Sequence, residues 1–192
     1  MDRNLAVAVA SCGSVDVSGT FFRHVSTAVR ELTGSNSGGR WGEPGAYSVL
    51  YLGRPPESVT VEAYRHLVDG IEGMQPEFVA PRRLLTVEVN LATVLDLRLP
   101  ENQETVGLTA SDLRSAVGDY ARCQRLGRVA HQLGLHGIIA PAATGLGETL
   151  AVFELHLSPN EQPNLIDTEV WHTLPADPRT LRAVEPTDGE AD

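Results

Sequence analysis

The sequence predicts a single α+β (mixed α/β) domain, in which central β-sheets are flanked by helices. Segments of alternating apolar and polar residues occur between segments with helical periodicity, as expected for such a fold. No linker or internal repeat divides the 192 residues, a length that suits one domain with a sizeable core. A hydrophobic content of 42% and a charged content of 21% are typical of a soluble globular protein.

In the first third of the chain, the pattern predicts two helices and two strands. They are an amphipathic helix near residues 5–10, strands over Thr20–Val25 and Tyr47–Leu52, and a helix from Ser58 to about Ile71. Both strands are rich in β-branched and aromatic residues, and Pro55 and Pro56 end the second one. Apolar residues at helical spacing support the second helix, and the glycine-rich segment before Tyr47 is expected to be a loop.

In the remainder of the chain, we expect three strands and three helices. They are strands over Leu84–Leu97, Gly137–Pro141 and Thr149–Leu157, with Ala151, Phe153 and Leu155 facing inward, and helices over Pro100–Val106, Ala110–Val117 and Tyr120–Leu133. Gly127 in the last helix would permit close packing, and Gly134 suits its C-terminal cap. Residues 176–192 lose periodicity and are expected to form an acidic, disordered tail after a lead-in of residues 1–19 and a domain of residues 20–175.

The charge and cysteine content restrict the classes of partner. Fifteen basic and twenty-five acidic residues give a net charge of −10, which argues against direct binding of nucleic acid, since phosphate backbones require a basic surface. Cys12 and Cys123 cannot form a disulfide framework, so a reducing cytoplasm is the expected compartment. No apolar run approaches the ~20 residues of a membrane span, so no membrane association is expected.

Common catalytic and metal-binding signatures are missing from the sequence. It has no phosphate-binding loop, no nucleophile elbow and no cysteine pair with zinc spacing. The six histidines are scattered, and His131 and His136 are better explained as structural or solvated residues than as metal ligands. We therefore predict no metal site.

One stretch brings chemically distinctive side chains together. Arg40, Tyr51 and Glu62 are separated by eleven residues each. They fall on a glycine-rich turn (Gly38–Gly45), a strand and the start of a helix, respectively. Glycines allow a sharp turn and a close approach of the backbone to a ligand. Spacing alone leaves two interpretations open: the three side chains converge on one cleft, or they are ordinary surface residues.

Six segments, taken in order, resemble the RES domain, the toxin half of the RES–Xre toxin–antitoxin systems. They are Phe22-Arg23-His24, Gly39-Arg40-Trp41, Leu50-Tyr51-Leu52, Val61-Glu62 with Arg65-His66, Cys123-Gln124, and Gly137 to Ala143. The resemblance covers roughly residues 20–157. The sequence departs from the family pattern at Ala142, where a serine usually follows the proline, and at Gly42, where asparagine is common.

The resemblance implies a fold like that of ADP-ribosyltransferases and cleavage of the nicotinamide–ribose bond of NAD, without a metal. It assigns catalytic roles to Glu62, Tyr51 and Arg23. A carboxylate can stabilise the oxocarbenium-like transition state of such a cleavage, and an aromatic face can hold the cationic nicotinamide. Arginine suits the pyrophosphate, so NAD binding is expected from Arg23, Arg40 and Tyr51. His24 and Gln124 either bind NAD or orient their neighbours.

The expected function is therefore a growth-arresting toxin that degrades NAD as a glycohydrolase or phosphorylase. Transfer of ADP-ribose to a protein and a non-catalytic module that keeps the cleft stay as alternatives, the latter suggested by Ala142. The resemblance also implies an Xre-type antitoxin with a helix-turn-helix domain as partner, with a homodimer or a higher toxin–antitoxin assembly possible. The acceptor of ADP-ribose is left open by the sequence.

Overall fold

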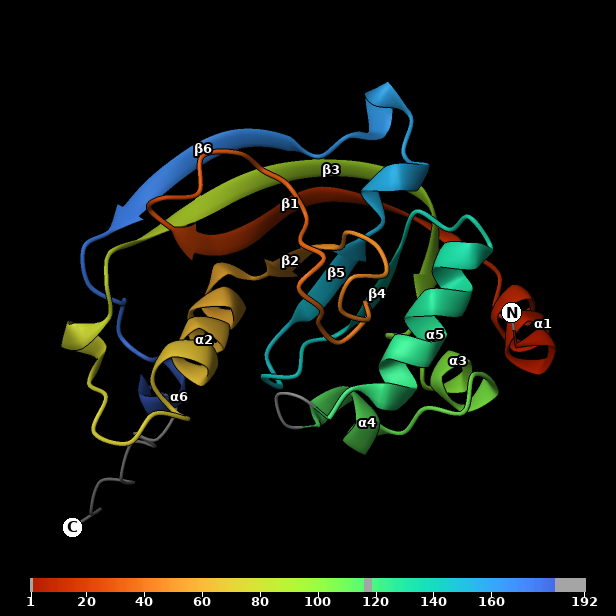
Figure 1. Ribbon diagram of the computed structural model, residues 1–192, viewed down its shortest axis with the longest axis horizontal. Helices are drawn as coiled ribbons and strands as arrows, with labels where there is room; N and C mark the ends of the chain where they lie inside the picture. The colour runs from red at the N-terminus through yellow and green to blue at the C-terminus, as the bar shows by residue number, and fades with distance from the viewer. Residues whose placement is uncertain (1, 116–118, 182–192) are drawn as a thin grey trace, which may run out of the picture.

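Two long antiparallel strands, β1 (Val15–Ser26) and β3 (Arg82–Asp96), dominate the sheet of this computed structural model, which describes residues 2–115 and 119–181. On β3 the predicted alternation is confirmed, because Leu85, Val87, Val89 and Leu91 are buried whereas Glu88 and Asn90 are exposed. The other edge of β3 pairs with an outer strand, β6 (Asn164–Trp171). These three strands arch over one half of the molecule (Figure 1).

Three short strands complete the sheet and close it on itself. β1 pairs with β2 (Leu50–Arg54), which pairs with β5 (Glu148–Val152), and β5 pairs with β4 (Gly137–Pro141). β4 then runs parallel to the end of β3, which itself pairs with β1. The two walls of this closed arrangement bury a common core that includes Phe21, Leu52, Val87, Ile139 and Leu150.

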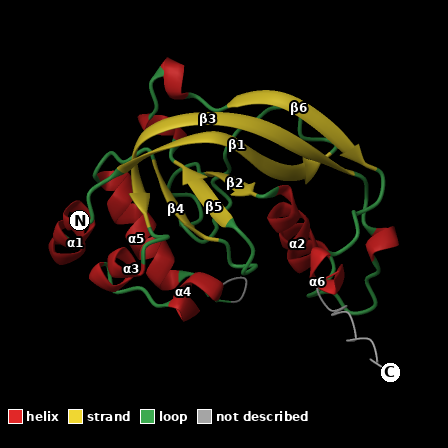
Figure 2. Ribbon diagram, turned by 180° about the vertical axis from the view of Figure 1, so that it is seen from behind, coloured by secondary structure: helices red, strands yellow, loops and turns green. Residues whose placement is uncertain are grey.

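The helices lie at two sides of the sheet (Figures 1 and 2). Helix α2 (Pro56–Leu67) lies under the arch of β1, β3 and β6, and the short α6 (Pro178–Leu181) lies beside it. The other helices gather near β4: α1 (Arg3–Ser11), α3 (Pro100–Thr105), α4 (Ala110–Arg114) and α5 (Ala121–Gln132). The predicted mixed fold, with helices flanking a central sheet, is thus confirmed.

Helix α5 packs against the glycine-rich turn, as its glycine predicts. A Cβ atom on Gly127 would overlap the carbonyl oxygen of Trp41, whose side chain is buried in the same core as Cys123 and Leu126. Gly134, with a φ of 76°, follows the helix in the left-handed conformation typical of a glycine cap. Close contact between this helix and the turn positions one side of the site.

Several predicted boundaries differ from the observed ones. β1 begins at Val15 and therefore crosses the expected boundary between the lead-in and residue 20. The strand expected over Tyr47–Leu52 occupies Leu50–Arg54 instead. Helix α2 ends at Leu67, because the backbone leaves helical geometry at Val68, and Ile71 is 47% exposed rather than on the packed face.

The end of β5 and the region after it were also predicted incorrectly. β5 stops at Val152, and Leu155, expected to face inward, is 81% exposed in a 3₁₀ turn (Glu154–His156). The carboxylate of Glu154 accepts a 2.8 Å hydrogen bond from the backbone N–H of Gly34, which holds this turn away from the strand direction. Strand β6 was not predicted at all.

The expected tail contains structure in its described part. Helix α6 lies within residues 176–192, and its Arg179 forms ion pairs with Asp69 and Asp177. The predicted helical end at Val117 and the acidic segment Glu185–Asp192 lie outside the described residues. Among the helices that the structure describes, none has the length and apolarity needed to cross a bilayer.

Candidate active site

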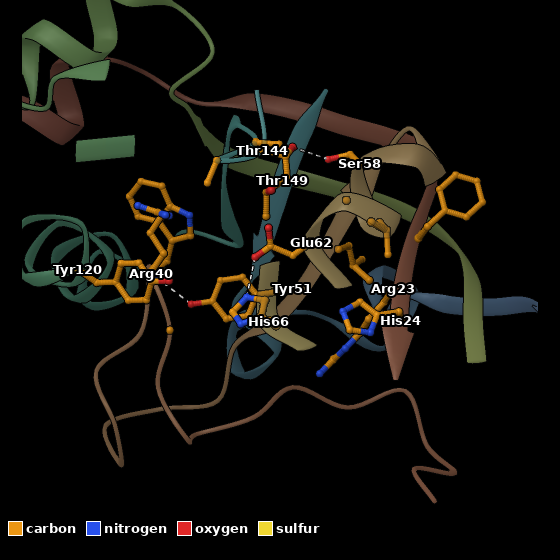
Figure 3. Close-up of a pocket in the computed structure, with 18 of the residues that line it drawn as sticks. Arg23, His24, Arg40, Tyr51, Ser58, Glu62, His66, Tyr120, Thr144 and Thr149 are labelled. Atoms are coloured by element: carbon orange, nitrogen blue, oxygen red, sulfur yellow. Dashed lines mark hydrogen bonds and ion pairs between the residues drawn. The ribbon is translucent and has the colours of Figure 1, made fainter. Parts of the chain in front are cut away.

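The six residues predicted to form the site line one pocket of about 540 Å³: Arg23, His24, Arg40, Tyr51, Glu62 and Gln124. They come from β1, the glycine-rich turn, β2, α2 and α5, elements far apart in the sequence. Figure 3 shows the labelled side chains around this pocket, with Tyr51 and Glu62 near its centre. The structure therefore favours the interpretation in which these side chains converge on a cleft.

The glycine-rich turn is fixed by hydrogen bonds on both sides of Trp41. The backbone N–H of Trp41 donates to the Tyr51 hydroxyl at 2.9 Å, and the Tyr47 hydroxyl donates to the Trp41 carbonyl at 2.8 Å. The side-chain amide of Gln124 donates to the Gly39 carbonyl at 3.0 Å. Gly39 itself lies against the ring of Tyr51, where a Cβ atom would come within 2.7 Å of the hydroxyl. Gln124 thus positions the turn from α5.

Tyr51 presents its ring to the pocket and keeps its proton. Burial raises the pKa of its hydroxyl to about 12, so the group is neutral at physiological pH. The oxygen accepts from Trp41, which leaves the hydroxyl proton available as a donor. A neutral phenol with a fixed ring can support a flat ligand without adding charge to the pocket.

Glu62 is the carboxylate of the pocket, and two side chains of its own helix hold it. Its Oε1 lies 2.7 Å from Nε2 of His66, and its Oε2 accepts a 3.1 Å hydrogen bond from Arg65. Burial opposes ionisation, but hydrogen bonds and positive charge from His66 and Arg65 outweigh it and hold the pKa of Glu62 below its ordinary value. Glu62 is therefore ionised at neutral pH and can stabilise a developing positive charge.

Arg23 and His24 are adjacent near the end of β1 and differ in charge: Arg23 is cationic, whereas His24 is neutral at pH 7. Arg23 Nη1 donates to the Thr33 carbonyl at 2.9 Å, and within the described residues no carboxylate forms an ion pair with it. Burial and the nearby guanidinium of Arg82 lower the pKa of His24 to about 4, so His24 is neutral at pH 7. Nδ1 of neutral His24 can accept from Arg82 Nη2, which lies 3.2 Å away.

Arg40 lines the pocket but directs its terminal nitrogens at the protein. Nη1 donates to the Asp112 carbonyl at 2.8 Å and to the Ser115 hydroxyl at 2.9 Å, and Nη2 donates to the Ser115 carbonyl at 3.1 Å. Its guanidinium also lies 4.6 Å from the ring centre of Tyr120. Arg40 therefore ties the glycine-rich turn to the end of α4, whereas Arg23 has more donors free for a ligand.

The sequence interpretation missed several groups of the pocket. His66 and Arg65 were noted only as part of a motif, although their i,i+3 and i,i+4 spacing from Glu62 indicates side-chain contact on a helix. Tyr120 was not singled out. Three hydroxyl residues were not considered either: Ser58, Thr144 and Thr149. Ala142, the position of the family serine, is 3% exposed and lines the same wall.

The pocket provides an anionic carboxylate, a fixed aromatic ring and Arg23, an arginine that forms no ion pair within the described residues. Within those residues, the structure contains no cluster of three or more His, Cys, Asp or Glu side chains that could hold a metal ion. A carboxylate beside an aromatic face suits a reaction that develops positive charge on a bound ligand. An arginine in the pocket suits a ligand that carries phosphate.

The chain is similar to known proteins in both sequence and structure. NAD(+) phosphorylase MbcT of Mycobacterium tuberculosis is 29% identical to the chain over 164 residues, which cover 84% of this chain and 87% of the relative. The protein of the same name from Mycobacterium bovis matches equally well. The crystal structure of the M. tuberculosis MbcT–MbcA toxin–antitoxin complex superposes with a TM-score of 0.77 at 29% identity, covering 88% of this chain and 93% of that one. The family model of the RES domain matches residues 17–185, so the chain belongs to the RES domain family.

Proposed function

We propose that this protein is a toxin that degrades NAD by transferring its ADP-ribose unit from nicotinamide to inorganic phosphate. The observation that carries the proposal is the placement of ionised Glu62 and the Tyr51 ring in one pocket with Arg23. The similarity to the NAD(+) phosphorylase MbcT supports phosphate as the acceptor. We expect the activity in the cytoplasm.

In the proposed reaction, the bond between ribose C1′ and the nicotinamide nitrogen breaks, and its electron pair leaves with nicotinamide. Nicotinamide departs as a neutral molecule, so no general acid is required, in keeping with a pKa of Glu62 below the ordinary value. Positive charge develops on the ribose, and the Glu62 carboxylate stabilises this charge more than the ground state. A phosphate oxygen then forms the new bond to C1′, giving ADP-ribose 1″-phosphate.

The other pocket residues would bind and orient NAD. The Tyr51 ring would hold the cationic nicotinamide ring, and the free N–H groups of Arg23 would bind the pyrophosphate. Neutral His24 is suited to donate a hydrogen bond beside Arg23. Because Gln124 and Arg40 bind backbone atoms of the protein, we assign them mainly to positioning the glycine-rich turn and residues 112–115.

The test is incubation of purified protein with NAD, with and without phosphate, followed by quantification of nicotinamide and of the ribosyl product. We expect phosphate-dependent release of nicotinamide and a phosphorylated product. Glu62→Gln keeps the shape but removes the charge, and it should lower the rate by at least about 100-fold. Glu57→Gln, an exposed glutamate on the same helix, is the matched control and should retain the wild-type rate.

Other outcomes would select the alternatives. Free ADP-ribose regardless of phosphate would indicate a glycohydrolase, and ADP-ribose attached to protein would indicate a transferase. NAD binding without any release of nicotinamide would support a non-catalytic module, in line with Ala142. Near-wild-type activity of a stably folded Glu62→Gln protein would show that Glu62 is not the catalytic carboxylate.

We further propose that an Xre-type antitoxin with a helix-turn-helix domain binds this protein and covers the pocket near Arg40 and Glu62. Support comes from the similarity to MbcT in the MbcT–MbcA toxin–antitoxin complex. The net charge of −10 suits a basic, DNA-binding partner and leaves DNA contact to that partner. A toxin homodimer or a higher assembly of the complex is compatible with this proposal.

Co-expression with the neighbouring reading frame tests the antitoxin proposal. We expect co-purification, relief of growth arrest and loss of NAD degradation in the complex, and no operator binding by the toxin alone at moderate salt. Light scattering of the purified complex would give its stoichiometry. Failure to co-purify, together with unrelieved arrest, would contradict the antitoxin model and leave the NAD chemistry untouched.

A further inference from the structure

The pocket wall beside Glu62 carries three hydroxyl groups, although the position of the family serine is Ala142. Ser58 lies on α2, Thr144 lies in the loop after β4, and Thr149 lies on β5. Figure 3 shows Ser58, Thr144 and Thr149 grouped on the side of the pocket next to Glu62. The hydroxyl chemistry absent at residue 142 is thus available from other elements.

Ser58 and Glu62 project from the same face of α2, because residues four apart on a helix are neighbours. Ser58 is 3% exposed, and its hydroxyl oxygen lies 3.2 Å from that of Thr144. Thr144 Oγ1 in turn accepts from the backbone N–H of Leu146 and donates toward the Leu146 carbonyl, both at 3.2 Å. When Thr144 donates to the Leu146 carbonyl, Ser58 donates to Thr144 and offers its lone pairs to the pocket; in the reverse arrangement, its proton is free.

The loop that carries Thr144 is held rigidly against the start of α2. The backbone N–H of Ala142 donates to the Gly147 carbonyl at 2.9 Å, and Gly147 packs so tightly on Arg54 and Pro55 that a Cβ atom there would overlap the Arg54 carbonyl. Glu148, directly after the loop, forms ion pairs with Arg54 and Arg98. The Ser58–Thr144 pair is therefore preorganised, which is what a precise ligand contact requires.

Charge decides which part of a ligand suits this wall. Ser58, Thr144 and Thr149 are neutral, and the nearby Glu62 is anionic with Arg65 and His66 already paired to it. A phosphate group here would be repelled by the carboxylate and would meet hydroxyl donors only. A sugar is neutral, and its hydroxyls both donate and accept, so a carboxylate with adjacent hydroxyls suits it better.

We propose that the Ser58–Thr144 hydroxyl pair binds the nicotinamide-side ribose of NAD and fixes C1′ beside Glu62. Ser58 makes the contact, and Thr144 orients the Ser58 hydroxyl. The pair provides, from α2 and the loop after β4, the hydroxyl group that Ala142 lacks. This inference rests on the proposed binding of NAD in the pocket, and it assigns one part of the substrate to one wall.

The test compares the affinities of two probes, ADP-ribose and ADP, measured by isothermal titration calorimetry. ADP-ribose carries the ribose in question, whereas ADP lacks it and keeps the pyrophosphate. Ser58→Ala and Thr144→Val should each weaken ADP-ribose binding by about 3- to 10-fold, the effect of one neutral hydrogen bond, and leave ADP binding unchanged. Thr144→Ser should restore the affinity lost in Thr144→Val. Because the two hydroxyls act as one unit, the double variant should be little worse than either single variant.

A matched control removes a hydroxyl from the same helix outside the pocket. Thr60 Oγ1 donates to the Pro56 carbonyl, and Thr60→Val should leave the ratio of the two affinities at the wild-type value. Equal weakening of ADP-ribose and ADP in the Ser58 and Thr144 variants would overturn the proposal in favour of a structural role. Unchanged ADP-ribose affinity with a raised KM for phosphate would overturn it in favour of an acceptor site. Wild-type protein that prefers ADP-ribose over ADP but releases no nicotinamide would refute the proposed reaction and leave the ribose contact standing.

Discussion

The hydroxyl of Tyr51 accepts a 2.9 Å hydrogen bond from the backbone N–H of Trp41. The same side chain therefore supports the glycine-rich turn through its oxygen and faces the pocket with its ring. Trp41 is 1% exposed, so its N–H has little access to water and depends on this partner. Tyr51 therefore has two roles. Loss of its hydroxyl is expected to lower the stability of the glycine-rich turn, and loss of its ring is expected to weaken ligand binding.

Replacing Tyr51 by phenylalanine and by alanine should separate these two effects. Tyr51→Phe leaves the buried Trp41 N–H unpaired and should cost about 1–3 kcal/mol of unfolding free energy in urea titrations. It keeps the ring, so the KM for NAD should rise less than in Tyr51→Ala, which loses the stacking surface as well. Equal rises of KM in the two variants would assign the binding role to the hydroxyl.

The sequence could indicate which residues line the candidate site, but only part of how they are connected. The eleven-residue spacing of Arg40, Tyr51 and Glu62 and the family resemblance pointed to side chains that the structure places in one pocket. The Tyr51–Trp41 bond depends on the path of an irregular turn, and the contacts of Arg40 with Asp112 and Ser115 depend on how α4 ends. Neither follows from periodicity, because both involve an irregular loop.

Arg23→Lys should weaken NAD binding more than it weakens the fold. Arg23 has one hydrogen bond to the protein in the described residues, to the Thr33 carbonyl, and its remaining N–H groups can bind a pyrophosphate in a geometry that lysine cannot reproduce. We expect the KM for NAD to rise by about 10-fold, as for loss of one charge-assisted hydrogen bond. Arg40→Lys is the comparison and should mainly lower the melting temperature, since its terminal nitrogens bind Asp112 and Ser115. An unchanged KM in Arg23→Lys would rule out a contact in which two N–H groups of Arg23 bind the pyrophosphate together.

Strand β6, which was not predicted, lacks a one-sided hydrophobic pattern. In β6 only Trp171 is buried, and exposed residues such as Asp167 and Glu169 give no alternation, because the strand is held by backbone pairing to β3 at the sheet edge. Leu155 continued the apparent alternation of β5, but the hydrogen bond from Gly34 to Glu154 turns the chain first. On β3 and α5, where one face is buried, the pattern gave nearly correct elements.

His24 should make stability depend on pH in a defined window. Its pKa is lowered to about 4 by burial and by Arg82, His66 and Arg23, whereas a histidine in the unfolded chain has a pKa of about 6.5. Between these values the unfolded chain binds a proton that the native protein does not, so the unfolding free energy should fall as the pH decreases from about 6.5 to about 4. The slope is at most about 1.4 kcal/mol per pH unit.

His24→Gln should remove this contribution, as measured by urea titrations at a series of pH values, while His172→Gln, at an exposed position, should retain it. Glu62 overlaps only the acidic end of this window and acts in the same direction. Its lowered native pKa gives stability that is fully present above the unfolded glutamate value of 4.5 and is lost as the pH falls through the lower native pKa. An unaltered slope in His24→Gln would show that the pKa of His24 is not lowered in the native protein.

Gly127→Ala should displace the glycine-rich turn and so disrupt the site, although Gly127 does not line the pocket. A Cβ at this position would overlap the backbone carbonyl of Trp41, so either α5 or the glycine-rich turn must move. Movement of the turn strains the bond from Trp41 to Tyr51 and the bond from Gln124 to the Gly39 carbonyl. We expect a loss of about 2–4 kcal/mol in unfolding free energy, in the range of severe overpacking, together with a higher KM for NAD. Gly70→Ala is the control, because a Cβ there meets no atom within 4 Å and its φ is not positive. Wild-type stability of Gly127→Ala would mean that α5 does not press on the turn in solution.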